Sequence, residues 1–127
     1  MAINSDQDIV TARQKGRAMA GELGFSAGDA TLIATAISEL ARNIVSYARK
    51  GEITLKIVPA SSRQGLVIIA SDSGPGIPDI RQALRDGFST SGSLGLGLPG
   101  VRRLMDEFEL TSKPGRGTVV TVKKWKA

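Results

Sequence analysis

The sequence predicts an α/β two-layer sandwich, in which a mixed or antiparallel sheet carries helices on one face. Two observations support this fold. Two long segments early in the chain place apolar residues at helical spacing, and four shorter apolar segments are separated by turns rich in Gly and Pro. Apolar residues make up 41% of the 127 residues, which is enough for the core of one domain covering residues 1–127.

Two helices are expected before the first strand. Residues 6–23 have an amphipathic pattern, and Gly24 is a natural C-cap for them. The second helix is expected from a cap at Ser26, with Asp29 completing a partial capping box, to about Arg49. Its apolar face is spaced for packing on a sheet and comprises Ile33, Ile37, Leu40, Ile44 and Ala48.

Strands and two shorter helices complete the prediction. A continuous apolar run, typical of a central strand, separates an alternating strand from two closing strands. The strands are expected at Glu52–Val58, Leu66–Ala70, Glu109–Ser112 and Thr118–Trp125. One short helix is expected from Pro78 to about Asp86, because proline suits a first helical turn. Another is expected from about Pro99 to Phe108.

The composition excludes several kinds of mechanism. The chain has neither cysteine nor histidine, which excludes disulfides, thiolate catalysis, Ser-His-Asp chemistry, His-ligated zinc and a phosphohistidine on this chain. Acid–base chemistry must therefore fall to Glu, Asp, Lys or Tyr. No apolar run reaches the roughly 20 residues that span a bilayer, and no signal-peptide pattern opens the chain. A cytoplasmic protein without membrane contact is expected.

The net charge of +5 does not by itself indicate nucleic-acid binding. The basic residues are scattered, and aromatic residues that could stack on bases are only 4% of the chain. No nucleic-acid partner is therefore expected. An acidic protein partner, or the phosphates of a small ligand, explains the charge at least as well.

Glu39 and Asn43 stand one helical turn apart, at the border of the second helix's apolar face. A carboxylate and a carboxamide placed in this way can offer a base and a hard oxygen ligand to one site. Arg42 is expected to point the other way. Two solvated polar residues on a helix side are the alternative explanation, and this helix alone favours that alternative.

Asp72 follows the buried strand and precedes Gly74 and Gly76, which flank a proline. The glycines allow positive φ and close approach of a ligand to the backbone. An aspartate fixed at a strand end suits the exocyclic amine of a purine. An ordinary turn that begins with Asp is the alternative explanation.

A Ser/Gly-rich run, Ser89–Gly97, leads into a helix, and such a helix start offers backbone N–H groups to phosphate. Its glycines match the letters of a dinucleotide-binding loop, but no strand immediately precedes them and no acidic residue follows at about 20 residues. A P-loop is excluded because no Gly-Lys-Ser/Thr follows. A flexible loop is the alternative. Gly115–Thr118, by itself, is compatible with a plain hairpin turn.

The order and spacing of these four motifs resemble the N, G1, G2 and G3 boxes of GHKL ATP-binding domains, which have the Bergerat fold. Gyrase, Hsp90, MutL, histidine kinases and anti-sigma-factor kinases belong to this family. Longer matches resemble one branch, the RsbT-like switch serine/threonine kinases of the stressosome. These matches are Thr35–Asn43, Gly76–Arg81, Asp86–Gly92 and Gly97–Phe108.

The resemblance implies ATP and Mg²⁺ as ligands. It makes Glu39 the general base for a substrate hydroxyl and Asn43 the ligand of Mg²⁺. It makes Asp72 the acceptor of the adenine N6 amine, helped by Thr118. The further nucleotide contacts that it implies are Gly74, Gly76, Ile77, Gly92, Gly95, Leu96, Gly97 and Leu98. Arg42, Arg102 and Arg103 are candidates for neutralising the γ-phosphate.

The resemblance also implies partners. This branch phosphorylates a serine or threonine on STAS-domain scaffold proteins, then binds and activates the N-terminal domain of a PP2C-type phosphatase. Two alternatives stay open. One is an anti-sigma-factor kinase that binds a sigma factor directly, and the other is a binding module that uses ATP without turnover.

Overall fold

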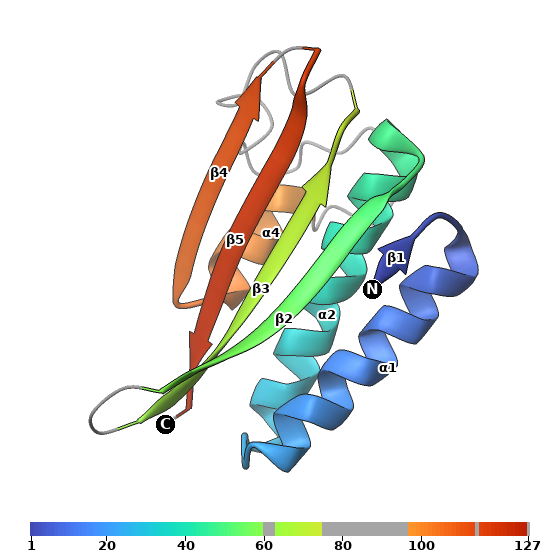
Figure 1. Cartoon of the computed structure of the whole chain (residues 1–127). Helices are drawn as coiled ribbons and strands as arrows, with labels where there is room; N and C mark the ends of the chain where they lie inside the picture. The colour runs from blue at the N-terminus through green and yellow to red at the C-terminus, as the bar shows by residue number, and fades with distance from the viewer. Residues whose placement is uncertain (60–62, 75–96, 114, 127) are drawn as a thin grey trace.

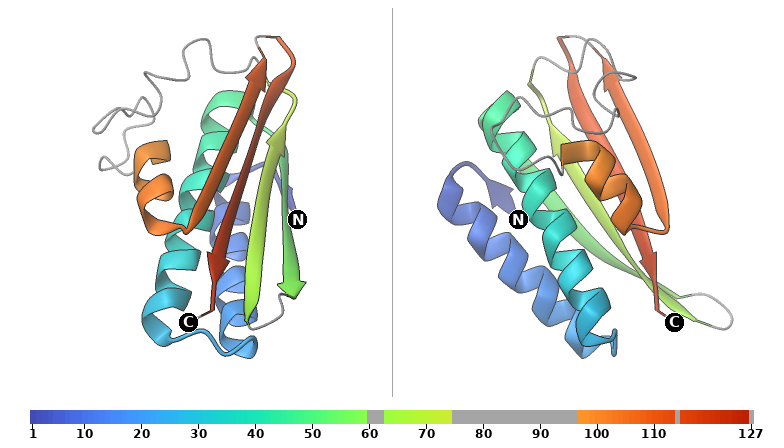
Figure 2. Two further views of the ribbon diagram at one scale, coloured as in Figure 1. Left: turned by 90° about the vertical axis from the view of Figure 1, so that its left-hand side faces the viewer. Right: turned by 180° about the vertical axis from the view of Figure 1, so that it is seen from behind.

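Helices pack on one face of an antiparallel sheet, which has five strands among the described residues (Figures 1 and 2). The computed structural model describes residues 1–59, 63–74, 97–113 and 115–126. The elements are β1 (Ala2–Ile3), α1 (Asp6–Glu22), α2 (Ala27–Asn43), the π-helix η1 (Ile44–Ala48), β2 (Gly51–Pro59), β3 (Gln64–Asp72), α4 (Gly97–Leu104), β4 (Glu107–Lys113) and β5 (Gly117–Trp125). The predicted α/β two-layer sandwich is confirmed.

The strands lie in the order β1-β2-β3-β5-β4, and each neighbouring pair is antiparallel. The central strand β3 pairs with β5 from Gly65, opposite Trp125, to Asp72, opposite Thr118. Asp72 and Thr118 therefore lie side by side at one end of the sheet, and Trp125 lies at the other.

The core lies between α2 and the sheet. The predicted apolar face of α2 is confirmed, because Ile33, Ile37 and Leu40 are at most 1% exposed. Ile44 is also buried, and Ala48, in η1, is half-buried. The facing residues of the sheet that are fully buried include Ile53, Leu66, Ile68 and Val122.

Ile37→Ala should lower the free energy of unfolding by roughly 2–5 kcal/mol, because it removes a buried side chain and leaves a cavity. The matched control is Ile57→Ala, whose side chain is 49% exposed and leaves little cavity. Urea unfolding checks both variants. Equal losses would contradict this placement of the core.

Several predicted boundaries differ from the structure. The helix expected to reach Phe108 ends at Leu104, and β4 already begins at Glu107. The reason is tertiary pairing: the backbone N–H of Asp106 donates to the carbonyl of Lys123 at 2.9 Å, and Phe108 lies opposite Val122 in the ladder. The helix expected at 78–86 lies outside the described residues.

The second predicted helix contains two kinds of helix. Its start is confirmed, because the Ser26 hydroxyl accepts from the backbone N–H of Asp29 at 3.1 Å. The α-helix ends at Asn43 and continues as η1 to Ala48, and Arg49 then has φ of 71°. None of the described helices is long and apolar enough to cross a bilayer.

Candidate functional site

One end of the sandwich gathers Asp72, Gly74 and Thr118, three of the residues predicted to bind nucleotide. Asp72 ends β3, directly opposite Thr118 near the start of β5. The end of η1 packs against the same end of the sheet. A Cβ added to Gly74 would lie only 2.6 Å from the Cβ of Ala48. In Figure 1 this is the upper end of the sheet, where β3 ends, β5 begins and η1 lies alongside.

The carboxylate of Asp72 is held in a fixed orientation. Its Oδ1 accepts a hydrogen bond from the backbone N–H of Gly74 at 2.9 Å, and the residue is half-buried. This is the local bond of an aspartate-initiated turn. A carboxylate can accept several hydrogen bonds, so the turn leaves Asp72 able to accept from a ligand as well.

The backbone around Asp72 is packed without room for side chains. Gly117 has φ of 108°, and a Cβ there would lie 2.0 Å from the carbonyl oxygen of Asp72. Gly51 also has no room for a side chain, since its Cβ would lie 2.5 Å from the carbonyl oxygen of Ser71. The Gly-x-Gly-Thr motif therefore does more than form a hairpin turn. Its second glycine allows β5 to lie close against the end of β3.

Gly117→Ala should destabilise the fold more than Gly115→Ala. Both glycines have positive φ, which costs an alanine roughly 1–2 kcal/mol. A Cβ on Gly115 meets nothing within 4 Å, whereas one on Gly117 overlaps the backbone of Asp72 and costs roughly 1–3 kcal/mol more. Thermal unfolding of the two variants measures the difference, and equal costs would contradict the close approach.

Thr118 is oriented by a residue that the sequence analysis missed. The hydroxyl oxygens of Thr118 and Ser112 lie 2.9 Å apart, and Ser112 lies opposite Thr118 on β4. The alternation of β4 could have indicated Ser112, because it is half-buried on the same face as Phe108 and Leu110. The strand pairing that joins it to Thr118 is not visible in the sequence.

Glu39 is buried in α2 and is only 5% exposed. Its Oε1 accepts from Nη1 of Arg42 at 2.7 Å. Its Oε2 is buried and has no hydrogen-bond partner among the residues that the structure describes. The explanation of Glu39 as a solvated side chain is therefore wrong.

The expectation that Arg42 points away from Glu39 is also wrong, because positions i and i+3 on a helix are neighbours. Arg42 is 39% exposed at its side chain and forms an ion pair with Glu39. Its guanidinium group thus binds this carboxylate. Arg42 was expected to be one of three candidates for neutralising the γ-phosphate.

Asn43 is the last residue of α2, at the point where the α-helix becomes η1. It is half-buried, one turn beyond Glu39. Short π-helical segments inside helices are frequent at functional sites. Here the π-helical segment extends to Ala48, which contacts Gly74 just after the end of β3.

Gly97 and Leu98 begin α4 and are buried. Leu98 belongs to the hydrophobic core, so its side chain contributes to packing. The other predicted contacts, Gly76, Ile77, Gly92, Gly95 and Leu96, lie outside the described residues.

The described residues fit ATP and Mg²⁺. A buried carboxylate oxygen without a partner is costly unless another group reaches it, and Glu39 Oε2 is such an atom. The described part of the chain has no cluster of three acidic residues that could hold a metal alone. Mg²⁺ usually takes one or two protein ligands and completes its shell with phosphates and water, which suits Asn43.

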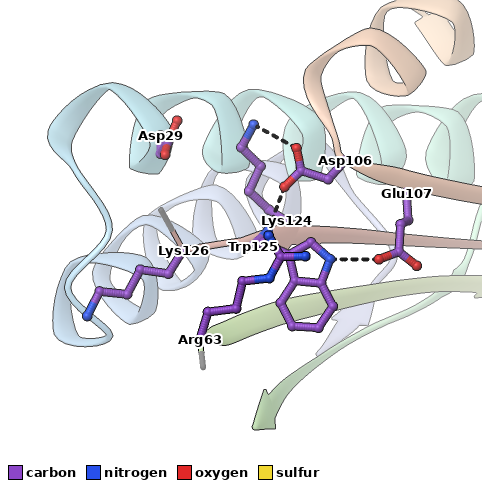
Figure 3. Close-up of a pocket in the computed structure, with 7 residues that line it drawn as sticks. All are labelled: Asp29, Arg63, Asp106, Glu107, Lys124, Trp125 and Lys126. Atoms are coloured by element: carbon purple, nitrogen blue, oxygen red, sulfur yellow. Dashed lines mark hydrogen bonds and ion pairs between the residues drawn. The ribbon is translucent and has the colours of Figure 1, made fainter. Parts of the chain in front are cut away.

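A hollow lies at the opposite end of β3 and β5 from Asp72 (Figure 3). It has a volume of about 580 Å³ and is lined by Asp29, Arg63, Asp106, Glu107, Lys124, Trp125 and Lys126. Several of its polar groups bind one another. The indole N–H of Trp125 donates to Glu107 at 2.7 Å, and Lys124 Nζ lies 3.7 Å from Asp106. This hollow lacks an unpartnered buried acceptor like that of Glu39, and the site at Asp72 is the better candidate.

Comparisons with known proteins identify the family of the chain. Residues 28–127 match the family model described as "Histidine kinase-, DNA gyrase B-, and HSP90-like ATPase". Serine/threonine-protein kinase RsbT of Bacillus subtilis (strain 168) is 59% identical, covering 97% of this chain and 92% of that protein. An anti-sigma F factor of Thermoanaerobacter sp. (strain X514) is 32% identical, with 97% and 89% covered.

Solved structures share the fold at lower identity. The mycobacterial sensor histidine kinase MprB aligns with a TM-score of 0.60 at 15% identity, covering 99% of this chain and 97% of that one. The catalytic domain of histidine kinase ThkA aligns with a TM-score of 0.56 at 16% identity, covering 99% and 95%. The resemblance found in the sequence motifs is confirmed: the chain belongs to the family of histidine kinase-, DNA gyrase B- and HSP90-like ATPases.

Proposed function

We propose that this chain is a cytoplasmic serine/threonine protein kinase that transfers the γ-phosphoryl group of ATP to STAS-domain scaffold proteins. The observation that supports this most is Glu39, a buried carboxylate whose Oε2 has no partner in the described part of the chain. A module that only binds ATP has no need of such a group one helical turn from a metal ligand. The identity of 59% to a serine/threonine-protein kinase supports the same reaction.

The roles divide between the two ends of this site. Asp72 and Thr118, side by side on β3 and β5, accept and orient the adenine. Glu39 takes the proton of the attacking hydroxyl, and Asn43 supplies an oxygen to Mg²⁺. Bound Mg²⁺ neutralises charge on the phosphates during transfer. Phosphoryl transfer is mainly positioning and charge neutralisation, so a base, a metal ligand and a phosphate-binding loop are sufficient parts.

The kinase would act as a partner switch. After it phosphorylates the scaffold, it leaves the scaffold and binds the N-terminal domain of a PP2C-type phosphatase, which it activates. The net charge of +5 supports acidic protein partners. Binding to nucleic acid or membrane is not part of this proposal.

The test is a transfer assay with γ-labelled ATP, Mg²⁺ and the STAS-domain proteins of the same genome. Label on a serine or threonine of a STAS protein, located by mass spectrometry, is the expected result. Other proteins of similar size and charge serve as acceptor controls. Label that spreads equally over the controls, or no label at all, would refute the proposed substrate class.

A second candidate is an anti-sigma-factor kinase that binds a sigma factor directly. The 32% identity to an anti-sigma F factor over 97% of the chain favours it. Co-purification with each sigma factor and each STAS protein of the genome separates the two candidates. The switch-kinase proposal predicts an ATP-dependent complex with STAS proteins and none with a sigma factor.

A further inference from the structure

The side chains of Glu39 and Arg42 form an asymmetric pair. Nη1 of Arg42 donates to Oε1 of Glu39 at 2.7 Å, while Oε2 of the same carboxylate is buried and no described residue bonds to it. The side chain of Glu39 is 6% exposed and that of Arg42 is 39% exposed. The arginine therefore reaches from the surface to one oxygen of a buried group and does not bond to the other.

This asymmetry has a physical consequence. A glutamate side chain has several rotamers, and the two oxygens of its carboxylate are chemically equivalent until a neighbour distinguishes them. A charge-assisted bond from a guanidinium is short and directional. It holds Oε1 toward Arg42, and Oε2 then points away from that bond in one orientation.

We propose that Arg42 is a positioning residue, which holds the Glu39 carboxylate so that Oε2 accepts the proton of the substrate hydroxyl. This inference rests on the proposed kinase function. It assigns Arg42 to the base, because its Nη1 is bound to Oε1 of Glu39. The orientation of the base, and not the affinity for ATP, is what Arg42 controls.

The experiment is a double-mutant cycle with the full chain, Mg-ATP and the STAS acceptor. The variants are Arg42→Ala, Arg42→Lys, Glu39→Gln and the double variant E39Q/R42A, with Arg17→Ala on the exposed face of α1 as the control. The rate of a single round of transfer and the ATP dissociation constant are measured for each. Free guanidinium is added to Arg42→Ala in a separate series.

Arg42→Ala should slow transfer by roughly 10- to 100-fold, because a small misplacement of a reacting group has an effect of this size. Its ATP dissociation constant should stay within about twofold of the wild type. In the Glu39→Gln background the same change should have little further effect, because Arg42 acts through Glu39. Guanidinium and the lysine variant should each restore part of the rate.

Two results together would overturn the inference and place Arg42 at the phosphates. Arg42→Ala would bind ATP more weakly, and its loss of transfer rate would add fully to the loss caused by Glu39→Gln. An unchanged transfer rate in Arg42→Ala would overturn it as well. Absence of transfer by the wild type to every acceptor is a different outcome. That result would refute the proposed function itself and the catalytic role of the pair with it.

Discussion

Glu39→Gln is expected to slow phosphoryl transfer to the acceptor by about 10²- to 10⁴-fold, which is the usual contribution of a general base. Glutamine has the shape of glutamate and can still accept from Arg42 through its side-chain oxygen, but it cannot take a proton from a hydroxyl. Because the change is confined to the reacting proton, the ATP dissociation constant should stay within about twofold. Rapid-quench transfer and equilibrium ATP binding measure the two quantities separately.

Ser38→Ala is the matched control for this variant. Ser38 is the other buried polar residue among the described residues, and its hydroxyl donates to the carbonyl of Ala34 at 3.0 Å. Its hydrogen bond is thus made within the helix, and its removal should leave transfer unchanged. If Glu39→Gln transferred phosphate at the wild-type rate, the chain would be a nucleotide-gated binding module and not a kinase acting through this base.

Asp72→Asn is expected to weaken ATP binding by roughly 10- to 100-fold, since a hydrogen bond to a charged group contributes about 1.5–3 kcal/mol. The asparagine oxygen can still accept from the backbone N–H of Gly74, so the turn should survive. What changes is the acceptor offered to the adenine amine. The loss should therefore appear in ATP affinity and not in the free energy of unfolding.

Guanine carries a carbonyl oxygen where adenine carries the amine, so the wild type should prefer ATP to GTP. The amide of the Asp72→Asn variant can donate as well as accept, and the preference should shrink. Asp8→Asn is the control, because the carboxylate of Asp8, on α1, also accepts a local backbone bond, from the N–H of Asn4 at 2.8 Å. Equal effects of the two variants would show that Asp72 does not recognise the base.

Much of the fold could be predicted because periodic apolar patterns decide it. The face of α2 that includes Ile37 and Leu40, and the apolar run of β3, are strong local signals. The cap at Ser26 is an equally strong local signal. The predicted boundary between α4 and β4 was wrong, because the backbone hydrogen bond from Asp106 to Lys123 depends on a strand late in the chain.

The candidate site was predicted through its motifs more than through its geometry. Asp72 and Gly74 could be found because a glycine-rich turn after a buried strand is unusual. The burial of Glu39 and its pairing with Arg42 depend on how α2 packs in the fold, which helical spacing alone does not determine. The contact of Thr118 with Ser112 needs the pairing of β4 with β5, which a single sequence does not contain.

ATP is expected to bind at the Asp72 end of the sandwich, and an amide shift map recorded on addition of Mg-ATP tests this placement. Asn43, Asp72, Gly117 and Thr118 should shift, while the indole N–H of Trp125, the single tryptophan, should not. Asp72→Asn should reduce the shifts at ATP concentrations that just saturate the wild type. Shifts centred on Trp125 and the hollow around it would instead place the nucleotide at the opposite end of the sheet and contradict ATP binding at Asp72.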